Sequence, residues 1–210
     1  MKAWKKKLVR GLGILLALVL SLAALILWIP MADYGFARAV PEAEARLRLD
    51  VVSEAESWLG TAEGEQRHLE ILEIYNSHQP LAQSYTVLPE DNWCAAFASA
   101  VAIRLGLTEI VPTECGCERQ IGLFADIDRW QEKDTYLPLP GDYIFYAWGD
   151  SPLGDCTGWA DHVGIVAGTW GPFIKVIEGN KDDCVSVRYT TRWDPTIRGY
   201  GLPDYAGNAQ

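Results

Sequence analysis

The feature that most constrains the fold of this chain is a change of pattern at the Pro-Gly-Asp of residues 140–142. Before this turn, apolar side chains recur at helical spacing, over about 42–59, 65–75, 94–105 and 118–130. After it come short runs rich in β-branched and aromatic residues, at 143–148, 162–167, 173–178, 184–189 and 196–200. Helices followed by strands predict an α+β domain, with N-terminal helices packed on an antiparallel sheet.

A basic and then uncharged N-terminus precedes this domain. Residues 1–10 carry five basic side chains, and residues 11–32 carry no charged one. A membrane-spanning helix needs ~20 apolar residues, whereas a cleavable signal has a shorter apolar stretch of about 7–15. We therefore expect a cytoplasmic basic tail (1–10) and one transmembrane signal-anchor (11–32), with the rest facing outward. The alternative is secretion after cleavage at the small-x-small sequence of residues 37–39.

Beyond the anchor, the sequence predicts a stalk that enters the first helix (33–50), one domain (51–205) and a short tail (206–210). All acidic residues lie after residue 32, so this part holds 13 basic and 28 acidic side chains, a net charge of −15. An acidic surface argues against nucleic acid as a partner. It also argues against charge-driven retention on an anionic cell wall, so a membrane tether would supply localisation. We expect a monomer.

Three residue types needed by a cysteine hydrolase occur in this domain. Cys94 stands where a polar turn becomes an apolar helix, His162 begins one predicted strand, and Glu178 ends the next. A thiol is nucleophilic as its thiolate, and a helix N-terminus together with a nearby base lowers its pKa. Asp91 or Asn92 is expected to cap this helix. The backbone N–H of Cys94 is then a candidate donor for an oxyanion hole.

The strands that carry the histidine and the glutamate are expected to form a hairpin. If Ala167 pairs with Phe173, then His162 pairs with Glu178, because paired numbers in an antiparallel hairpin have a constant sum. The carboxylate would then fix the imidazole tautomer and stabilise the imidazolium. Asn180 lies two residues further on, hence on the same face if the strand continues.

The other four cysteines form an even set in a domain expected to be exported, where disulfides are permitted. The hairpin sum pairs Cys156 with Cys184, and we predict this disulfide. Cys115 and Cys117 are separated by one glycine, which leaves a local bridge, free thiols or a metal site open. No second cysteine pair or histidine stands at zinc spacing, so no metal is expected.

Each of these residues also has an ordinary structural interpretation. A cysteine in a small-residue helix is commonly just buried, and Asn180 is also typical of a turn. The full set in this order is nevertheless rarely met by chance. His68 and His78 are weaker bases, since one lies in an amphipathic helix and the other in a loop. Trp93 and Trp159 flank the proposed catalytic residues and are predicted to contact substrate.

Four segments resemble the CHAP domain, a branch of the NlpC/P60-type, papain-like cysteine hydrolases. They are WCAAF at 93–97, PGDYIF at 140–145, DHVGIV at 161–166 and IEGN at 177–180. The resemblance extends over about residues 51–205. It implies a papain-like α+β fold and cleavage of amide bonds in peptidoglycan.

By position, the resemblance implies Cys94 as nucleophile, His162 as general base and then acid, and Glu178 as the orienting group. Asn180 would be an auxiliary polar residue. Some family members carry an Asp-rich calcium loop before the cysteine, which residues 88–92 do not resemble. The expectation of no metal and no other cofactor is therefore kept.

The sequence thus predicts a membrane-anchored, outward-facing cysteine hydrolase of peptidoglycan. The bond is either the N-acetylmuramoyl–L-alanine amide or a peptide bond in the stem or cross-bridge. The alternative is a catalytically silent wall-binding or assembly module on the same fold. The set of Cys94, His162 and Glu178 argues against that alternative, because a binder needs no nucleophile. An intracellular-type cysteine protease is disfavoured by the export segment.

Overall fold

The computed structural model describes residues 13–21, 40–132, 136–149 and 156–208. Beyond residue 40, its helices are α3 (Glu42–Ser57), α4 (Gln66–Ser77), the short 3-10 turn η1 (Ala82–Ser84), α5 (Cys94–Arg104), α6 (Cys117–Asp126) and α7 (Tyr205–Asn208). Its strands are β1 (Trp130–Glu132), β2 (Tyr143–Tyr146), β3 (His162–Trp170), β4 (Phe173–Glu178), β5 (Ser186–Thr191) and β6 (Ile197–Gly201). The predicted order of helices and strands is confirmed, except that α6 ends early and a short strand follows it.

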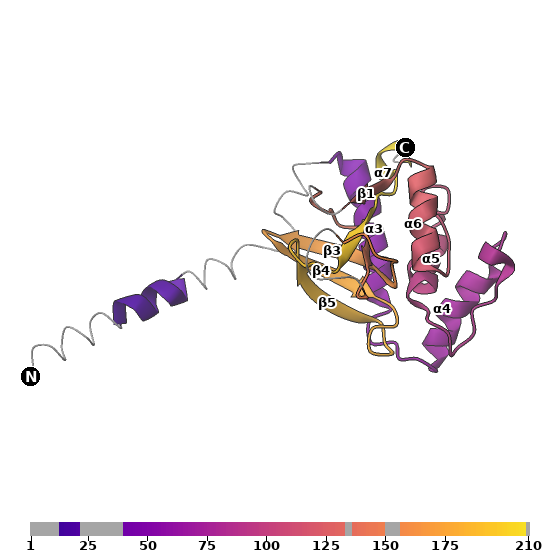
Figure 1. Cartoon of the computed structure of the whole chain (residues 1–210), viewed down its shortest axis with the longest axis horizontal. Helices are drawn as coiled ribbons and strands as arrows, with labels where there is room; N and C mark the ends of the chain where they lie inside the picture. The colour runs from indigo at the N-terminus through magenta and orange to yellow at the C-terminus, as the bar shows by residue number, and fades with distance from the viewer. Residues whose placement is uncertain (1–12, 22–39, 133–135, 150–155, 209–210) are drawn as a thin grey trace, which may run out of the picture.

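The strands form one antiparallel sheet in the order β1-β6-β2-β3-β4-β5. The helices gather on one side of strands β3 to β5 (Figure 1). Alternate residues of a strand face opposite sides of the sheet. Accordingly Tyr143 and Phe145 join the core beneath the helices, while Ile144 and Tyr146 join a smaller core on the other face. The predicted α+β architecture with an antiparallel sheet is therefore confirmed.

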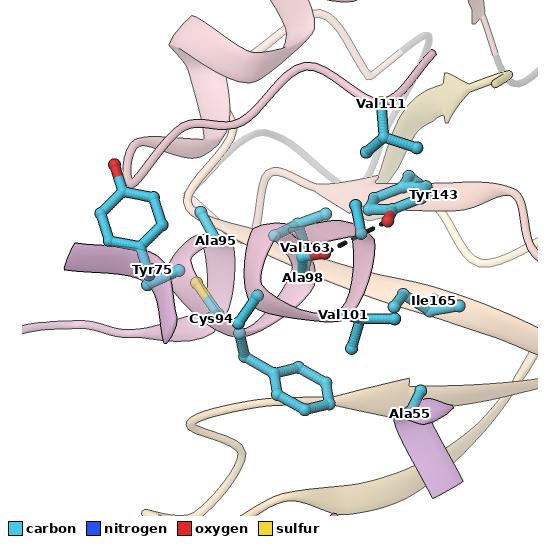
Figure 2. Close-up of a cluster of buried hydrophobic side chains, with 14 of the residues drawn as sticks. Ala55, Tyr75, Cys94, Ala95, Ala98, Val101, Val111, Tyr143, Val163 and Ile165 are labelled. Atoms are coloured by element: carbon cyan, nitrogen blue, oxygen red, sulfur yellow. Dashed lines mark hydrogen bonds between the residues drawn. The ribbon is translucent and has the colours of Figure 1, made fainter. Parts of the chain in front are cut away.

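Helix α5 is buried from Cys94 to Ala102 and lies directly against the sheet. Its small side chains allow a close approach, and the hydroxyl of Tyr143 donates a hydrogen bond to the Ala98 carbonyl at 3.1 Å (Figure 2). A Cβ atom added to Gly179 would lie 2.5 Å from the Cβ of Phe97. Only glycine therefore lets the first turn of α5 dock onto the chain that leaves β4.

Helix α3 is tied to the turn that opens the sheet by a buried ion pair. Arg48 Nη1 donates to Asp142 Oδ1 at 2.7 Å and to the Pro140 carbonyl at 3.1 Å. Arg48 Nε donates to Glu44 at 2.8 Å. Burial raises the pKa of Asp142, although Arg48 opposes that rise. The second half of the predicted stalk (33–50) is thus part of the folded domain from Glu42 onward, because these buried contacts are made by its residues.

The predicted membrane span over residues 11–32 is not supported by the structure. Within the described residues, no helix has both the length and the apolarity needed to cross a bilayer. Residues 13–21 form a short helix whose residues are exposed. The rest of the predicted span, the basic tail (1–10), the start of the stalk and the last two residues lie outside the described part of the chain.

Replacing Arg48 with Met is expected to lower the free energy of unfolding by about 3–5 kcal/mol, because the Asp142 carboxylate stays buried without its cation. The matched control is Arg46→Met on the same helix. Its pair with Glu42 is exposed, at 73% and 90%, so a change below about 1 kcal/mol is expected. Urea unfolding followed by circular dichroism measures both. Equal, small effects would show that the Arg48 pair does not hold α3 to the sheet.

Candidate active site

The three reactive residues predicted from the sequence meet at the N-terminus of α5. Cys94 is the first residue of α5, His162 the first of β3 and Glu178 the last of β4. His162 Nε2 lies 3.2 Å from Glu178 Oε2. The imidazole also forms a hydrogen bond with the Cys94 thiol, for which the Glu178 contact leaves Nδ1. All three are nearly or fully buried, with exposed fractions of 4%, 5% and 0%.

The hairpin of β3 and β4, which carries His162 and Glu178, has a different turn from the predicted one. Trp170 pairs with Phe173, so the strands are joined by two residues rather than five. The first turn residue, Gly171, has φ +53°. Two-residue turns with glycine first match the right-handed twist of a hairpin, which favours the longer strands. The predicted pairing of Ala167 with Phe173 was therefore wrong, and the register also shifts at a bulge next to Ala167.

The register change nevertheless keeps the imidazole and the carboxylate together. Ile165 pairs with Ile177, which places Gly164 rather than His162 opposite Glu178. A shift by two residues leaves every side chain on the same face, and diagonal neighbours remain within reach of long side chains. A Cβ atom on Gly164 would lie 2.7 Å from Glu178 Cγ. Because Gly164 has no side chain, the Glu178 side chain can extend diagonally over it, on the same face of the sheet, and reach His162.

The contacts of the thiol and the imidazole favour an ion pair. Hydrogen bonds from the Cys117 thiol, from His162 and from the backbone N–H of Val163 hold the pKa of Cys94 well below its usual value, against the effect of burial. Burial lowers the pKa of His162, but contacts with Cys94 and Glu178 outweigh it and raise this pKa to about 9. These opposite shifts favour the form of the pair in which Cys94 is a thiolate and His162 an imidazolium.

The expected capping of α5 by Asp91 or Asn92 is not found. Trp93 is the N-cap residue, and no side chain caps the helix. Asp91 instead accepts a hydrogen bond from a backbone N–H in its own turn, and Asn92 accepts one from Asn180 at 3.4 Å. Asn180 itself has φ +56° in the turn after β4. The first-turn N–H groups of α5, including that of Cys94, are thus not taken up by a capping side chain, which suits them to an oxyanion.

The two tryptophans predicted to contact substrate differ in their placement. Trp93 is completely buried, its Nε1 donates to Glu63 at 3.1 Å, and its ring centroid lies 4.6 Å from that of His68. The Trp93 ring therefore has no exposed surface in this structure, and its contact with substrate stays a prediction. Trp159 is 75% exposed, and its role in binding stays a prediction.

Two residues that the sequence analysis missed complete the site. Arg188 Nε donates to Glu178 Oε1 at 2.6 Å. Trp148 stacks on His162 with ring centroids 4.7 Å apart, and the Arg188 guanidinium lies 5.1 Å from the Trp148 ring centroid. The pairing of β4 with β5 explains the position of the arginine: Ser186 pairs with Glu178, so Arg188 is the diagonal neighbour of Glu178 on the same face.

The predicted disulfide between Cys156 and Cys184 is not formed. No disulfide occurs in the part of the chain that the structure describes. Cys156 lies beside the Thr196 carbonyl, with its sulfur 3.6 Å from that oxygen. Cys184 instead pairs with Ala62 in an isolated antiparallel β-bridge of the backbone. Both cysteines lie beyond the ends of β3 and β4, where these two strands are no longer paired and the constant-sum rule for opposed residues does not apply.

A thiolate at a helix start, with an imidazolium and a carboxylate on two adjoining strands, is the set of groups that a cysteine hydrolase needs. Residues 84–180, which include Cys94, His162 and Glu178, match the family model of the CHAP domain. The predicted resemblance to the CHAP domain is therefore confirmed for this segment, and CHAP domains are in general cysteine amidases or peptidases that act on peptidoglycan. No curated protein and no solved structure matches the chain.

Removing the charge of Glu178 and removing that of Arg188 are expected to shift the pKa of His162 in opposite directions. Glu178→Gln should lower the pKa of His162 below about 9, because a nearby negative charge is lost. Arg188→Gln should raise it, because the remaining carboxylate is no longer neutralised. Arg192→Gln, just beyond the end of the same strand, is the matched control and should leave it unchanged. NMR titration checks this readily, since the chain has three histidines. Shifts of the same sign in both variants would refute the arrangement.

Proposed function

We propose that this protein is a cysteine hydrolase that cleaves an amide bond of peptidoglycan. The bond is the N-acetylmuramoyl–L-alanine amide or a peptide bond of the stem or cross-bridge. The observation that carries the proposal is the contact of His162 with both Cys94 and Glu178 inside the CHAP segment. A binding module would have no use for a buried ion pair that includes a nucleophile, since burying charges is costly.

The proposed reaction begins with attack of the Cys94 thiolate on the carbonyl carbon of the scissile amide. The oxygen then takes up negative charge beside the backbone N–H groups of the first turn of α5. His162 gives its proton to the leaving amine, which departs and leaves a thioester on Cys94. His162 next removes a proton from water, and the attack of that water releases the carboxylic acid and restores the thiolate.

The roles of the surrounding groups follow from their contacts. Glu178 keeps the His162 ring oriented and stabilises the imidazolium, as the third member of a triad does. Arg188 holds the second carboxylate oxygen and so fixes the rotamer of Glu178. Trp148, which stacks on His162, is 43% exposed, and Trp159, three residues before His162 in the chain, is 75% exposed. We propose that a substrate reaches Cys94 along these two rings.

An outward-facing, membrane-tethered location is part of the proposal, with secretion after signal cleavage as the alternative. Its support is the sequence: five basic side chains in residues 1–10 and no charged side chain in residues 11–32. The full-length protein is expected to stay with the membrane during carbonate extraction and to keep its own N-terminus. N-terminal sequencing that finds a start near residue 34 or 40 would show cleavage instead.

Cys94→Ala is expected to lower the rate of peptidoglycan digestion by several orders of magnitude, about 10⁶-fold for loss of a triad nucleophile, with the fold retained. Cys184→Ala is the matched control and should digest like the wild type. Mass spectrometry of the products identifies the bond: an amidase releases peptides that begin with L-alanine, whereas an endopeptidase leaves shortened peptides on the glycan. A wild-type protein that binds purified peptidoglycan without cleaving it would instead support the silent module.

A further inference from the structure

A second thiol lies next to the proposed nucleophile. Cys117 is the first residue of α6, and its Sγ lies 3.6 Å from that of Cys94. Both side chains are buried, at 4% and 7% exposure. The sulfur atoms need to approach by only about 1.5 Å to reach the S–S bond length of ~2.05 Å. Cys115 has other contacts, since its sulfur lies 3.5 Å from Glu114 Oε1.

The two neighbouring thiols differ in protonation. The pKa of Cys94 is lowered well below its usual value, first by the hydrogen bond from Cys117. The pKa of Cys117 is raised well above its usual value, first by the contact with Cys94 and then by burial. These opposite shifts favour an anionic Cys94 sulfur beside a Cys117 sulfur that keeps its proton. A reactive thiolate beside a second cysteine is the arrangement found in redox-sensing sites, where the second thiol resolves the oxidised form.

We propose that a hydroperoxide oxidises this pair to a reversible Cys94–Cys117 disulfide that switches the nucleophile off. The proposal rests on the positions of the two sulfurs and holds whichever bond the protein cleaves. It assigns an oxidative modification site to Cys117, which takes part in no bond-making step of the proposed hydrolysis.

The reaction is balanced in two steps. The Cys94 thiolate attacks one oxygen of the hydroperoxide, so that an S–O bond forms, the O–O bond breaks, and an alcohol or water leaves after taking up a proton. The Cys117 sulfur then attacks the Cys94 sulfur, so that the S–S bond forms and the S–O bond breaks. Hydroxide leaves as water with the thiol proton of Cys117. The two sulfurs supply the two electrons that reduce the peroxide, and a dithiol returns them.

Cys115 and Cys117 are only two residues apart, so variants are needed to tell which of them is cross-linked to Cys94. Trypsin cleaves after Arg67, Arg104 and Arg119. Cys94 therefore lies in peptide 68–104, and Cys115 and Cys117 both lie in peptide 105–119. The full-length protein is treated with hydrogen peroxide, its free thiols are blocked, and the digest is read by mass spectrometry. We expect a cross-link between these two peptides in the wild type and equally in Cys115→Ser. Dithiothreitol should restore full labelling of Cys94 in both.

The test variant is Cys117→Ser, which keeps a small polar side chain but removes the second sulfur. It should give no cross-link, and Cys94 should gain two or three oxygen atoms, a state that dithiothreitol does not reverse. A cross-link that survives in Cys117→Ser but is lost in Cys115→Ser would overturn the proposal. So would wild-type Cys94 oxidised beyond the sulfenic acid without a cross-link. These readouts are independent of hydrolysis, so either result leaves the test with Cys94→Ala on peptidoglycan unaffected.

Discussion

The close contact between α5 and the end of β4 is the constraint on which the rest of the site depends. Phe97 lies over Gly179, where a Cβ atom would be 2.5 Å away, so the helix is pinned at its first turn. Cys94 stands one turn before Phe97, and Glu178 stands one residue before Gly179. The packing that buries the core therefore also sets the distance between Cys94, the proposed nucleophile, and the His162–Glu178 pair.

The second feature is an alternation of charges through a largely buried region. Arg188, Glu178, His162 and Cys94 form a chain of contacts, in which the pKa shifts favour an imidazolium at His162 and a thiolate at Cys94. Each buried charge is stabilised by its neighbours, and removal of one member leaves the next uncompensated. The site thus couples stability to reactivity. The same contacts that favour a Cys94 thiolate would also make this sulfur reactive toward oxidants, which is the basis of the role that we propose for Cys117.

Much of this arrangement was predictable because it is encoded locally. The helical spacing before residue 140 and the β-branched runs after it indicated an α+β domain, since periodicity reports which face of an element is buried. Cys94 at a helix start, His162 at a strand start and Glu178 at a strand end were recognisable from short motifs. Even a register error of two residues kept the histidine and the glutamate on one face, because the side-chain period of a strand is two.

The sequence by itself thus determined the fold class, the family resemblance and the choice of the three residues that we propose to be catalytic. Only the tertiary structure decided the two-residue turn, the buried place of Trp93 and the separation of Cys156 from Cys184. It also brought Arg188, Trp148 and Cys117 to the reactive pair. These features depend on contacts between elements far apart in the chain. Such contacts follow from how whole elements pack and twist, which no local pattern of residues specifies.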